Sequence, residues 1–174
     1  MSENMKEIIK QKTQTPLIIL MCGIAGSGKT TFAQQLEKEG FIRLSIDEEI
    51  WKDHGRYGID YHPKKYEEYK MEAEDKLRNQ LISLIHEKRK VVIDFSFWQK
   101  AKRDNYKQLI ENAGGEWKLI YMKASPEVLR KRLDVRSKRF DANAAFPITE
   151  DILTSFLNGF EPPSQEGEIV KEQH

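Results

Sequence analysis

The chain lacks the features that would assign it to a membrane or to a disulfide-rich class. Its 174 residues include a single cysteine, Cys22, which excludes an internal disulfide and cannot by itself form a zinc cluster. The longest apolar run, residues 17–22, has the length of a strand and not of a membrane span. Residues 1–4 lack the basic-then-apolar form of a signal peptide. We therefore expect a cytoplasmic protein with no membrane partner, in which Cys22 is a buried core residue.

The chain also lacks a strong net charge, repeats and low-complexity segments. With 29 basic and 28 acidic residues the formal net charge is +1, so no global field attracts the protein to nucleic acid. The apolar fraction of 39% and the charged fraction of 33% are typical of a globular protein. We expect one domain over residues 1–174, with a polar N-terminal arm at residues 1–15 and a tail at residues 161–174.

A glycine-rich motif provides the strongest functional signal. Residues 23–30 read Gly-Ile-Ala-Gly-Ser-Gly-Lys-Thr and match the P-loop pattern G-x-x-x-x-G-K-[ST], between a strand-like run and a segment of helical spacing. Backbone N–H groups converge on an anion at such a junction, where the helix dipole is positive. A plain glycine-rich turn would not explain Lys29 and Thr30. The residues expected to bind ATP phosphates are Gly23, Ala25, Gly26, Ser27, Gly28, Lys29, Thr30 and Thr31.

Strand-length apolar runs alternate with helical patterns, which predicts parallel βαβ units. Strands are expected at residues 17–22, 41–45, 90–95 and 117–122. Helices are expected from the P-loop to residue 39, at residues 64–88, 99–112 and 149–160, and after a cap at Ser125. The expected fold is an α/β P-loop NTPase of nucleotide-kinase type. Its parallel sheet of four or five strands carries helices on both faces, with an arginine-rich lid.

Asp94 ends the apolar run at residues 91–93, as the aspartate of a Walker B motif does, and we expect it to hold Mg²⁺ together with Thr30. An aspartate that caps a turn is the alternative. ATP-hydrolysing motors place a glutamate next, whereas this chain has Phe95, and no Asn-Lys-x-Asp element is present to recognise guanine. These absences favour phosphoryl transfer to a hydroxyl group.

Asp47 is the candidate general base for this transfer. It follows residues 41–45, at the carboxyl end of a predicted strand, where ligands bind in open α/β sheets. A carboxylate at this position can accept the proton of the attacking hydroxyl. Alternatively, Asp47 or Ser45 only caps the helix that follows.

A basic segment lies late in the chain: residues 123–140 contain seven basic and two acidic side chains. Arg132 and Arg136 are four residues apart and share one helix face, whereas Arg130 and Lys131 are expected to face solvent. We predict that Arg132 and Arg136 contact the ATP phosphates during catalysis, next to a lid loop at residues 137–147. A solvated basic surface is the alternative.

Residues 51–69 are rich in aromatic and basic side chains, and two hypotheses remain open for them. They form the acceptor pocket, or they pack in the interior. Tyr66 and Tyr69 fit the apolar stripe of the predicted helix and favour the interior. His54 and His62 lack a metal-binding pattern and are interpreted as ordinary polar residues.

Taken together, these motifs resemble the small P-loop kinases, in particular the kinase domain of phage polynucleotide kinase and the zeta-toxin and antibiotic phosphotransferase group. The resemblance extends from Leu17 to about Phe160. It implies an ATP donor, Mg²⁺, Asp47 as base, and lid arginines on the phosphates. The chain is also similar to bacterial P-loop ATP-binding proteins and predicted kinases that share a Phe-Glu-Pro-Pro segment, here residues 160–163.

One position departs from that resemblance. Polynucleotide kinases carry an arginine three residues after the base, and this chain has Ile50 there, beside the acidic Glu48 and Glu49. We therefore predict a phosphotransferase that acts on a hydroxyl of a small molecule. A 5′-hydroxyl polynucleotide kinase and an ATP-binding regulatory protein with little turnover are the alternatives.

Overall fold

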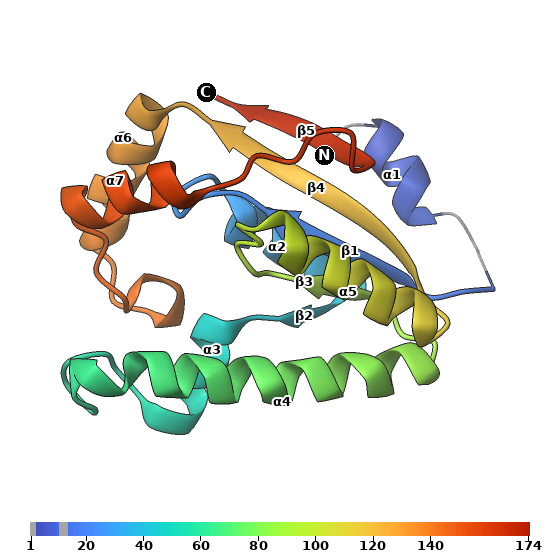
Figure 1. Ribbon diagram of the computed structural model, residues 1–174, viewed down its shortest axis with the longest axis horizontal. Coiled ribbons are helices and arrows are strands. Elements are labelled where there is room, and N and C mark those ends of the chain that lie inside the picture. Colours follow the sequence, from blue (N-terminus) through green and yellow to red (C-terminus); the bar gives the residue numbers. More distant parts are fainter. Residues whose placement is uncertain (1–2, 11–13) are drawn as a thin grey trace.

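The strands of the computed structural model form one parallel sheet in the order β2-β3-β1-β4-β5 (Figure 1). The structure describes residues 3–10 and 14–174. The strands are β1 (Leu17–Cys22), β2 (Ile42–Leu44), β3 (Val91–Ile93), β4 (Glu116–Ala124) and β5 (Glu168–Gln173). The α/β architecture expected from the sequence is confirmed. Parallel pairing brings the carboxyl ends of β1, β2 and β3 to one edge, where the P-loop, the helix α3 (Ile46–His54) and Asp94 follow.

Seven α-helices are assigned within the described ranges: α1 (Glu3–Lys10), α2 (Lys29–Lys38), α3 (Ile46–His54), α4 (Tyr66–His86), α5 (Lys100–Asn112), α6 (Pro126–Ser137) and α7 (Glu150–Gly159). The side chains of Ser45, Ser125 and Thr149 each accept a hydrogen bond from the backbone N–H three residues on. The predicted cap at Ser125 is thus confirmed. None of the helices in residues 3–10 and 14–174 is long and apolar enough to cross a membrane.

Alternate residues of β1 point to opposite faces of the sheet, and each face has its own core. Ile18 and Leu20 pack with α4 and α5, whereas Ile19 and Met21 pack with α1 and α2. Cys22 is fully buried, and burial raises the pKa of its thiol to about 11. The thiol is therefore an unreactive core group, as the sequence predicts.

The expected polar N-terminal arm differs from what is observed. Residues 3–10 form α1, and its Met5 and Ile9 are 2% and 6% exposed against the α2 face of the sheet. These two residues are four apart, so they lie on one side of the helix and bury together. Residues 1–2 and 11–13 of the expected arm lie outside the described residues.

The tail at residues 161–174 contains an unexpected strand, β5, which pairs in parallel with β4 at the edge of the sheet. The segment before it is held by Glu166, whose carboxylate accepts hydrogen bonds from Arg103 of α5 at 2.7 and 2.8 Å. The arginine side chain is fully buried. The tail is therefore an integral part of the fold.

A small third cluster lies beside the P-loop. Leu129 and Leu133 of α6 pack with Ile24 and with Leu153 of α7. Between these helices, the predicted lid loop at residues 137–147 contains a short 3₁₀ turn, Ala142–Ala144, which contacts α3. α6 and α7 therefore lie beside the P-loop, at the end of the sheet where β1 ends (Figure 1).

Candidate active site

The P-loop leaves β1 at Gly23 and enters α2 at Lys29. Gly28 precedes the helix in the left-handed conformation, with φ of 95°. At Gly23 a Cβ would lie 2.6 Å from the Ser27 hydroxyl oxygen and 2.7 Å from the Met122 carbonyl oxygen. Only glycine fits at this position, where the chain leaves β1 and turns toward α2.

Two polar side chains of the P-loop, those of Ser27 and Lys29, are shielded from solvent and form no hydrogen bond to a charged group in the part of the chain that the structure describes. The Ser27 hydroxyl is buried and has no hydrogen-bond partner among the described residues. Lys29 Nζ donates to the Ile24 carbonyl at 3.0 Å, and burial lowers the pKa of its ammonium group, against the opposing charges of Asp94 and Asp47. Buried polar groups of this kind fit an anionic ligand that would satisfy them.

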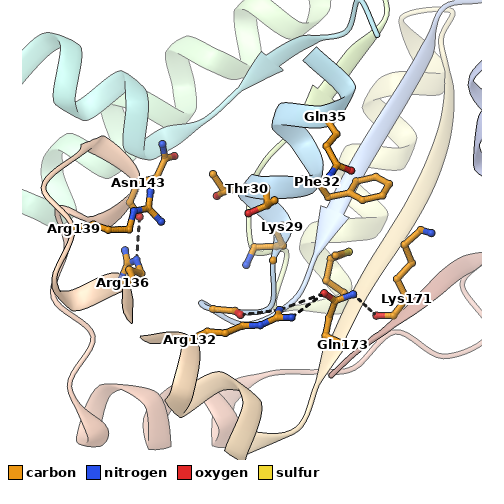
Figure 2. A pocket seen from close by; sticks show the side chains of 14 residues that line it. Lys29, Thr30, Phe32, Gln35, Arg132, Arg136, Arg139, Asn143, Lys171 and Gln173 are labelled. Carbon is orange, nitrogen blue, oxygen red and sulfur yellow. Dashed lines mark hydrogen bonds between the residues drawn. The ribbon is translucent and has the colours of Figure 1, made fainter. Parts of the chain in front are cut away.

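The P-loop borders an open cleft of about 530 Å³, which we call the P-loop cleft. Figure 2 shows Lys29 and Thr30 between the lid, with Arg136 and Asn143, and the β5 strand, with Gln173. The C-terminal strand thus forms one wall of the cleft. The sequence did not indicate this role for the tail.

Both predicted arginines of α6 point into the cleft, although they are held differently. Arg132 Nη1 lies 3.5 Å from the Gly26 carbonyl and 3.3 Å from Gln173 Oε1. Arg136 donates to the lid carbonyls of Asn143 and Phe146, each at 3.0 Å, and burial lowers its pKa. Arg132 therefore faces the loop, whereas Arg136 also braces the lid.

Arg130 and Lys131 face solvent, as the sequence predicts. Arg130 is exposed and pairs with Glu150 of α7 at 2.8 Å, and Lys131 is exposed. Arg139 pairs with Asp141 within the lid loop but also lines the cleft.

Asp94 follows β3 directly and pairs with an arginine that the sequence analysis missed. Arg43 of β2 donates to Asp94 Oδ2 from Nε at 2.9 Å and from Nη2 at 2.7 Å. The two side chains are 5% and 3% exposed. A charged residue within an apolar predicted strand was the available signal, because a buried guanidinium requires a carboxylate partner.

Asp47 lies in the first turn of α3, and the helix cap is Ser45, whose hydroxyl accepts from the Glu48 N–H at 3.3 Å. Burial and the neighbouring Asp94 carboxylate raise the pKa of Asp47 to about 6, partly offset by Arg136 and Lys29. A carboxylate with such a pKa is ionised at neutral pH and basic enough to accept a proton.

Asp47 lines a second hollow of about 280 Å³, which we call the Asp47 cavity. The P-loop cleft and the Asp47 cavity have in common the residues Lys29, Thr30, Arg136 and Asn143. The two hollows therefore meet at the end of the P-loop. Chemistry between a ligand in one and a ligand in the other would take place at this junction.

The aromatic residues of the 51–69 segment divide between two places. Tyr66 lines the Asp47 cavity, and Tyr69 stacks on His54 with ring centroids 3.5 Å apart. Both tyrosines are half-buried and lie outside the sheet cores, so their predicted interior position was wrong. The helix stripe indicated a buried face, but this end of α4 extends past the sheet.

The other part of that segment contacts the lid loop. Trp51 and Arg56 line a groove of about 400 Å³ with Phe140 of the lid loop. The Trp51 and Phe140 rings meet edge to face with centroids 6.0 Å apart, and the Arg56 guanidinium lies 5.2 Å from the Phe140 centroid. These residues pack against the outer side of the lid.

Thr30 and Asp94, the two residues predicted to hold Mg²⁺, both line the Asp47 cavity. Within residues 3–10 and 14–174 no group of three or more His, Cys, Asp or Glu side chains could hold a metal ion alone. Mg²⁺ bound to a nucleotide usually takes one or two protein oxygens and completes its shell with phosphates and water. The hydroxyl and carboxylate present fit that mode of binding.

The parallel sheet, the P-loop and the facing arginines define a P-loop domain of the nucleotide-binding type found in kinases. A family model described as AAA domain, AAA_33, matches residues 18–163. The chain belongs to this family. A comparison with curated protein sequences gave no match.

Solved structures of kinases are similar in fold. A candidate kinase from Chloroflexus aurantiacus J-10-fl is 20% identical with a TM-score of 0.70, over 92% of this chain and 86% of that one. A gluconokinase from Sinorhizobium meliloti 1021 is 17% identical with a TM-score of 0.61, over 92% and 84%. A chain of the Pnkp1/Rnl/Hen1 RNA repair complex is 18% identical with a TM-score of 0.61, over 87% of this chain and 48% of that one.

Proposed function

We propose that the protein is an ATP- and Mg²⁺-dependent phosphotransferase that moves the γ-phosphoryl group to a hydroxyl of a small molecule. The observation that carries this proposal is the meeting of two hollows at Lys29 and Thr30. A kinase needs a donor site and an acceptor site that open onto one another, whereas a protein that only binds a nucleotide needs one.

The donor half of the proposal rests on the P-loop cleft. The unpartnered Ser27 hydroxyl and the α2 N-terminus would receive phosphate oxygens. Lys29 would exchange its bond to the Ile24 carbonyl for a phosphate contact. Arg132 and Arg136 would balance the charge that spreads over the transferring group. Thr30 and Asp94 would hold Mg²⁺. When bound, this ion would neutralise part of the phosphate charge.

Asp47 would act as the general base. As the acceptor oxygen bonds to the γ-phosphorus, the bond from that phosphorus to the β–γ bridging oxygen breaks and ADP leaves with the oxygen. The hydroxyl proton passes to the Asp47 carboxylate, whose pKa of about 6 suits this transfer near neutral pH. The lid loop would exclude water and so favour the acceptor over hydrolysis.

A polynucleotide kinase is the second candidate, supported by the similarity in fold to the RNA repair chain. In polynucleotide kinases an arginine binds the acceptor's phosphate, and this chain has Ile50 at the corresponding position. The Ile50 side chain lies in the middle of α3 and is 4% exposed. A nucleic-acid acceptor would lack that cation, so we place the small-molecule acceptor first.

The test is transfer of label from γ-labelled ATP to a panel of nucleosides, sugars, aminoglycosides and 5′-hydroxyl oligonucleotides. Label should appear on a small-molecule acceptor in wild type and not in Asp47→Asn. Label on oligonucleotides alone, with binding that weakens steeply with salt, would support the second candidate. Tight ATP binding without transfer to any acceptor would support an ATP-binding regulatory protein with little turnover.

A further inference from the structure

Aromatic rings from four parts of the chain line the Asp47 cavity together with Asp47 itself. Tyr66 begins α4, Phe146 belongs to the lid loop, and Phe156 lies on α7. Phe95 and Trp98 come from the segment after β3. Ring-lined pockets bind ligands through apolar contact and stacking.

The rings are arranged as two walls. Tyr66 and Phe146 stack with centroids 4.4 Å apart and planes at 23°. Trp98 and Phe156 meet edge to face with centroids also 4.4 Å apart. The first pair joins α4 to the lid loop, and the second joins the segment after β3 to α7.

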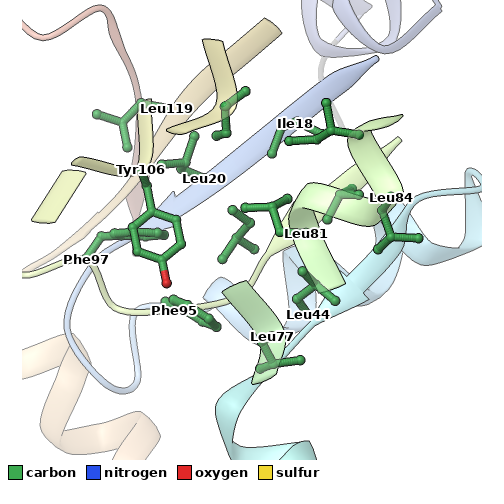
Figure 3. Packing of buried hydrophobic residues seen from close by; sticks show 14 of the residues in the cluster. Ile18, Leu20, Leu44, Leu77, Leu81, Leu84, Phe95, Phe97, Tyr106 and Leu119 are labelled. Carbon is green, nitrogen blue, oxygen red and sulfur yellow. The ribbon is translucent and has the colours of Figure 1, made fainter. Parts of the chain in front are cut away.

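The segment that carries Trp98 is fixed by buried contacts. Phe97 has φ of 48°, a conformation that a bulky residue rarely adopts. Its carbonyl accepts from Arg103 Nη1 at 2.8 Å and from Cys22 Sγ at 3.4 Å. Figure 3 shows Phe95 and Phe97 against Tyr106 in the core, with Phe97 and Tyr106 centroids 5.0 Å apart. Trp98 is therefore preorganised toward the cavity.

The charges of the cavity oppose a phosphate on the acceptor. Of its cations, Lys29 and Arg136 also face the P-loop cleft, and Lys70 pairs with Glu67 at 3.7 Å. Arg43, which is close by, is already paired with Asp94. Among the described residues that line the cavity, Lys70 is the one cation that the P-loop cleft does not share. Its side chain is 43% exposed, and it is outnumbered by the lining carboxylates of Asp47 and Glu67, which would repel a second phosphate group.

We infer that the acceptor is an alcohol without phosphate whose hydroxyl is carried by an aromatic or other flat, apolar ring. The ring would lie between the Tyr66–Phe146 and Trp98–Phe156 walls, with its hydroxyl directed to Asp47. At about 280 Å³ the cavity is near the lower limit of about 300 Å³ for ligand pockets, which suits one or two rings and not a polymer. This inference rests on the proposed function.

A binding experiment tests the ring site separately from catalysis. The chain has three tryptophans, so the variant Trp51→Phe/Trp117→Phe leaves Trp98 as the single emitter. With ADP and Mg²⁺ saturating the P-loop cleft, three probes are titrated: 4-nitrobenzyl alcohol, gluconate, and 4-(hydroxymethyl)phenyl phosphate, which keeps the alcohol and carries a phosphate across the ring. We expect saturable quenching of Trp98 by the nitrobenzyl alcohol. The ring phosphate should compete with it at least about tenfold more weakly than the nitrobenzyl alcohol binds, because the carboxylates in the lining would repel its phosphate.

A kinetic experiment tests the same site in the full-length wild type. ADP release is compared with three ring alcohols (4-nitrobenzyl alcohol, tryptophol and cyclohexylmethanol), with gluconate, and with a 5′-hydroxyl oligonucleotide. Ring alcohols should give at least tenfold higher kcat/KM. Trp98→Ala should raise the KM for the ring alcohol about three- to tenfold, and Trp98→Phe should restore it, since aromatic pairs contribute about 0.5–1.5 kcal/mol.

The outcomes separate the two ideas. A preference for gluconate or for the oligonucleotide would overturn the ring acceptor while supporting the phosphotransferase. Quenching by the ring alcohol without any acceptor-dependent ADP release would support the ring site and count against the phosphotransferase. Absence of both quenching and ring-alcohol turnover would overturn the inference. Phe156→Leu provides a second variant in case Trp98→Ala fails to fold.

Discussion

Arg43 Nη2 donates a hydrogen bond to Asn143 Oδ1 at 2.6 Å and so joins strand β2 to the lid loop. The same nitrogen binds Asp94 Oδ2, and Asn143 Nδ2 donates to Glu48 Oε1 at 2.7 Å. One guanidinium thus contacts both the proposed metal-binding carboxylate and the lid. We therefore expect the position of the lid and the orientation of Asp94 to depend on one another through Arg43.

Asn143→Ala should loosen the lid without disturbing the sheet. The change removes one hydrogen bond from a charged donor and one to a charged acceptor, each contributing roughly 1.5–3 kcal/mol. We expect faster trypsin cleavage after the lid residues Lys138 and Arg139 and a fall in kcat/KM for ATP of about tenfold or more. Asn158→Ala, at an exposed site on α7, is the matched control. Equal cleavage rates in the two variants would contradict the coupling.

Asp47→Asn should abolish turnover while nucleotide binding persists. General bases contribute about 10²–10⁴ in rate, so kcat should fall by that factor. In wild type, kcat/KM should rise with pH up to the pKa of about 6 and level off above it, because only the ionised carboxylate accepts the proton. Asp75→Asn, on the exposed face of α4, should retain full activity and the same profile. An unchanged acidic limb in Asp47→Asn would remove Asp47 from the mechanism.

Asp47→Asn should also stabilise the protein above pH 6. The pKa of Asp47 is raised from 3.8 to about 6 in the fold, so the folded state favours the protonated carboxyl. Ionised Asp47 consequently lowers the free energy of unfolding as pH rises from about 4 through 6. Thermal melts should give Asp47→Asn a higher Tm than wild type at pH 8, and the difference should vanish near pH 4. A lower Tm at pH 8 would contradict the burial argument.

Arg136 should matter far more than its exposed neighbour Arg130. An arginine on a transferring phosphoryl group contributes about 10³–10⁵ in kcat. Arg136→Lys keeps a charge but loses the planar fork that binds two lid carbonyls, and we expect a drop of about 10² or more. Arg130→Lys changes only a solvent-exposed pair with Glu150 and should alter kcat less than about threefold. If Arg136→Lys and Arg130→Lys lowered the single-turnover rate by similar factors, Arg136 would have only a structural role.

The parts of the fold that sequence predicts are those whose signal is local. The P-loop and the Ser125 cap depend on adjacent residues and backbone groups, so their residue types alone predict them. The β5 strand was missed because it is an edge strand with charged residues at positions 168, 171 and 172 and no apolar alternation. Its pairing with β4 is a long-range property of the chain.

The same division applies to the candidate site. Lys29, Asp47 and Asp94 follow strands in the pattern that P-loop proteins share, so they could be named from the sequence. The partners of Arg43 and Trp98 could not be named in this way, because Asp94 and Phe156 lie 51 and 58 positions further along the chain. Tyr66 was misassigned because helical spacing reports a buried face but not what covers it.

Arg103 should be the residue that joins the stability of the tail to the shape of the site. Its guanidinium binds Glu166 ahead of β5 and also donates to the carbonyls of Phe97 and Trp98. Arg103→Ala removes both hydrogen bonds to the buried Glu166 carboxylate and leaves it only Lys107, whose Nζ lies 3.5 Å from Oε2. We therefore expect a loss of roughly 3 kcal/mol in the free energy of unfolding. Urea titration measures this change.

Lys100→Ala, which breaks an exposed pair with Asp104 on the same helix, is the control and should cost less than about 1 kcal/mol. In Arg103→Ala the emission of Trp98, isolated by Trp51→Phe/Trp117→Phe, should also shift to longer wavelength, because the loop that holds the indole in the cavity loses two of its hydrogen bonds. A stability loss without that shift would assign Arg103 to the tail alone. A loss below about 1 kcal/mol would show that neither the tail nor the loop depends on this buried pair.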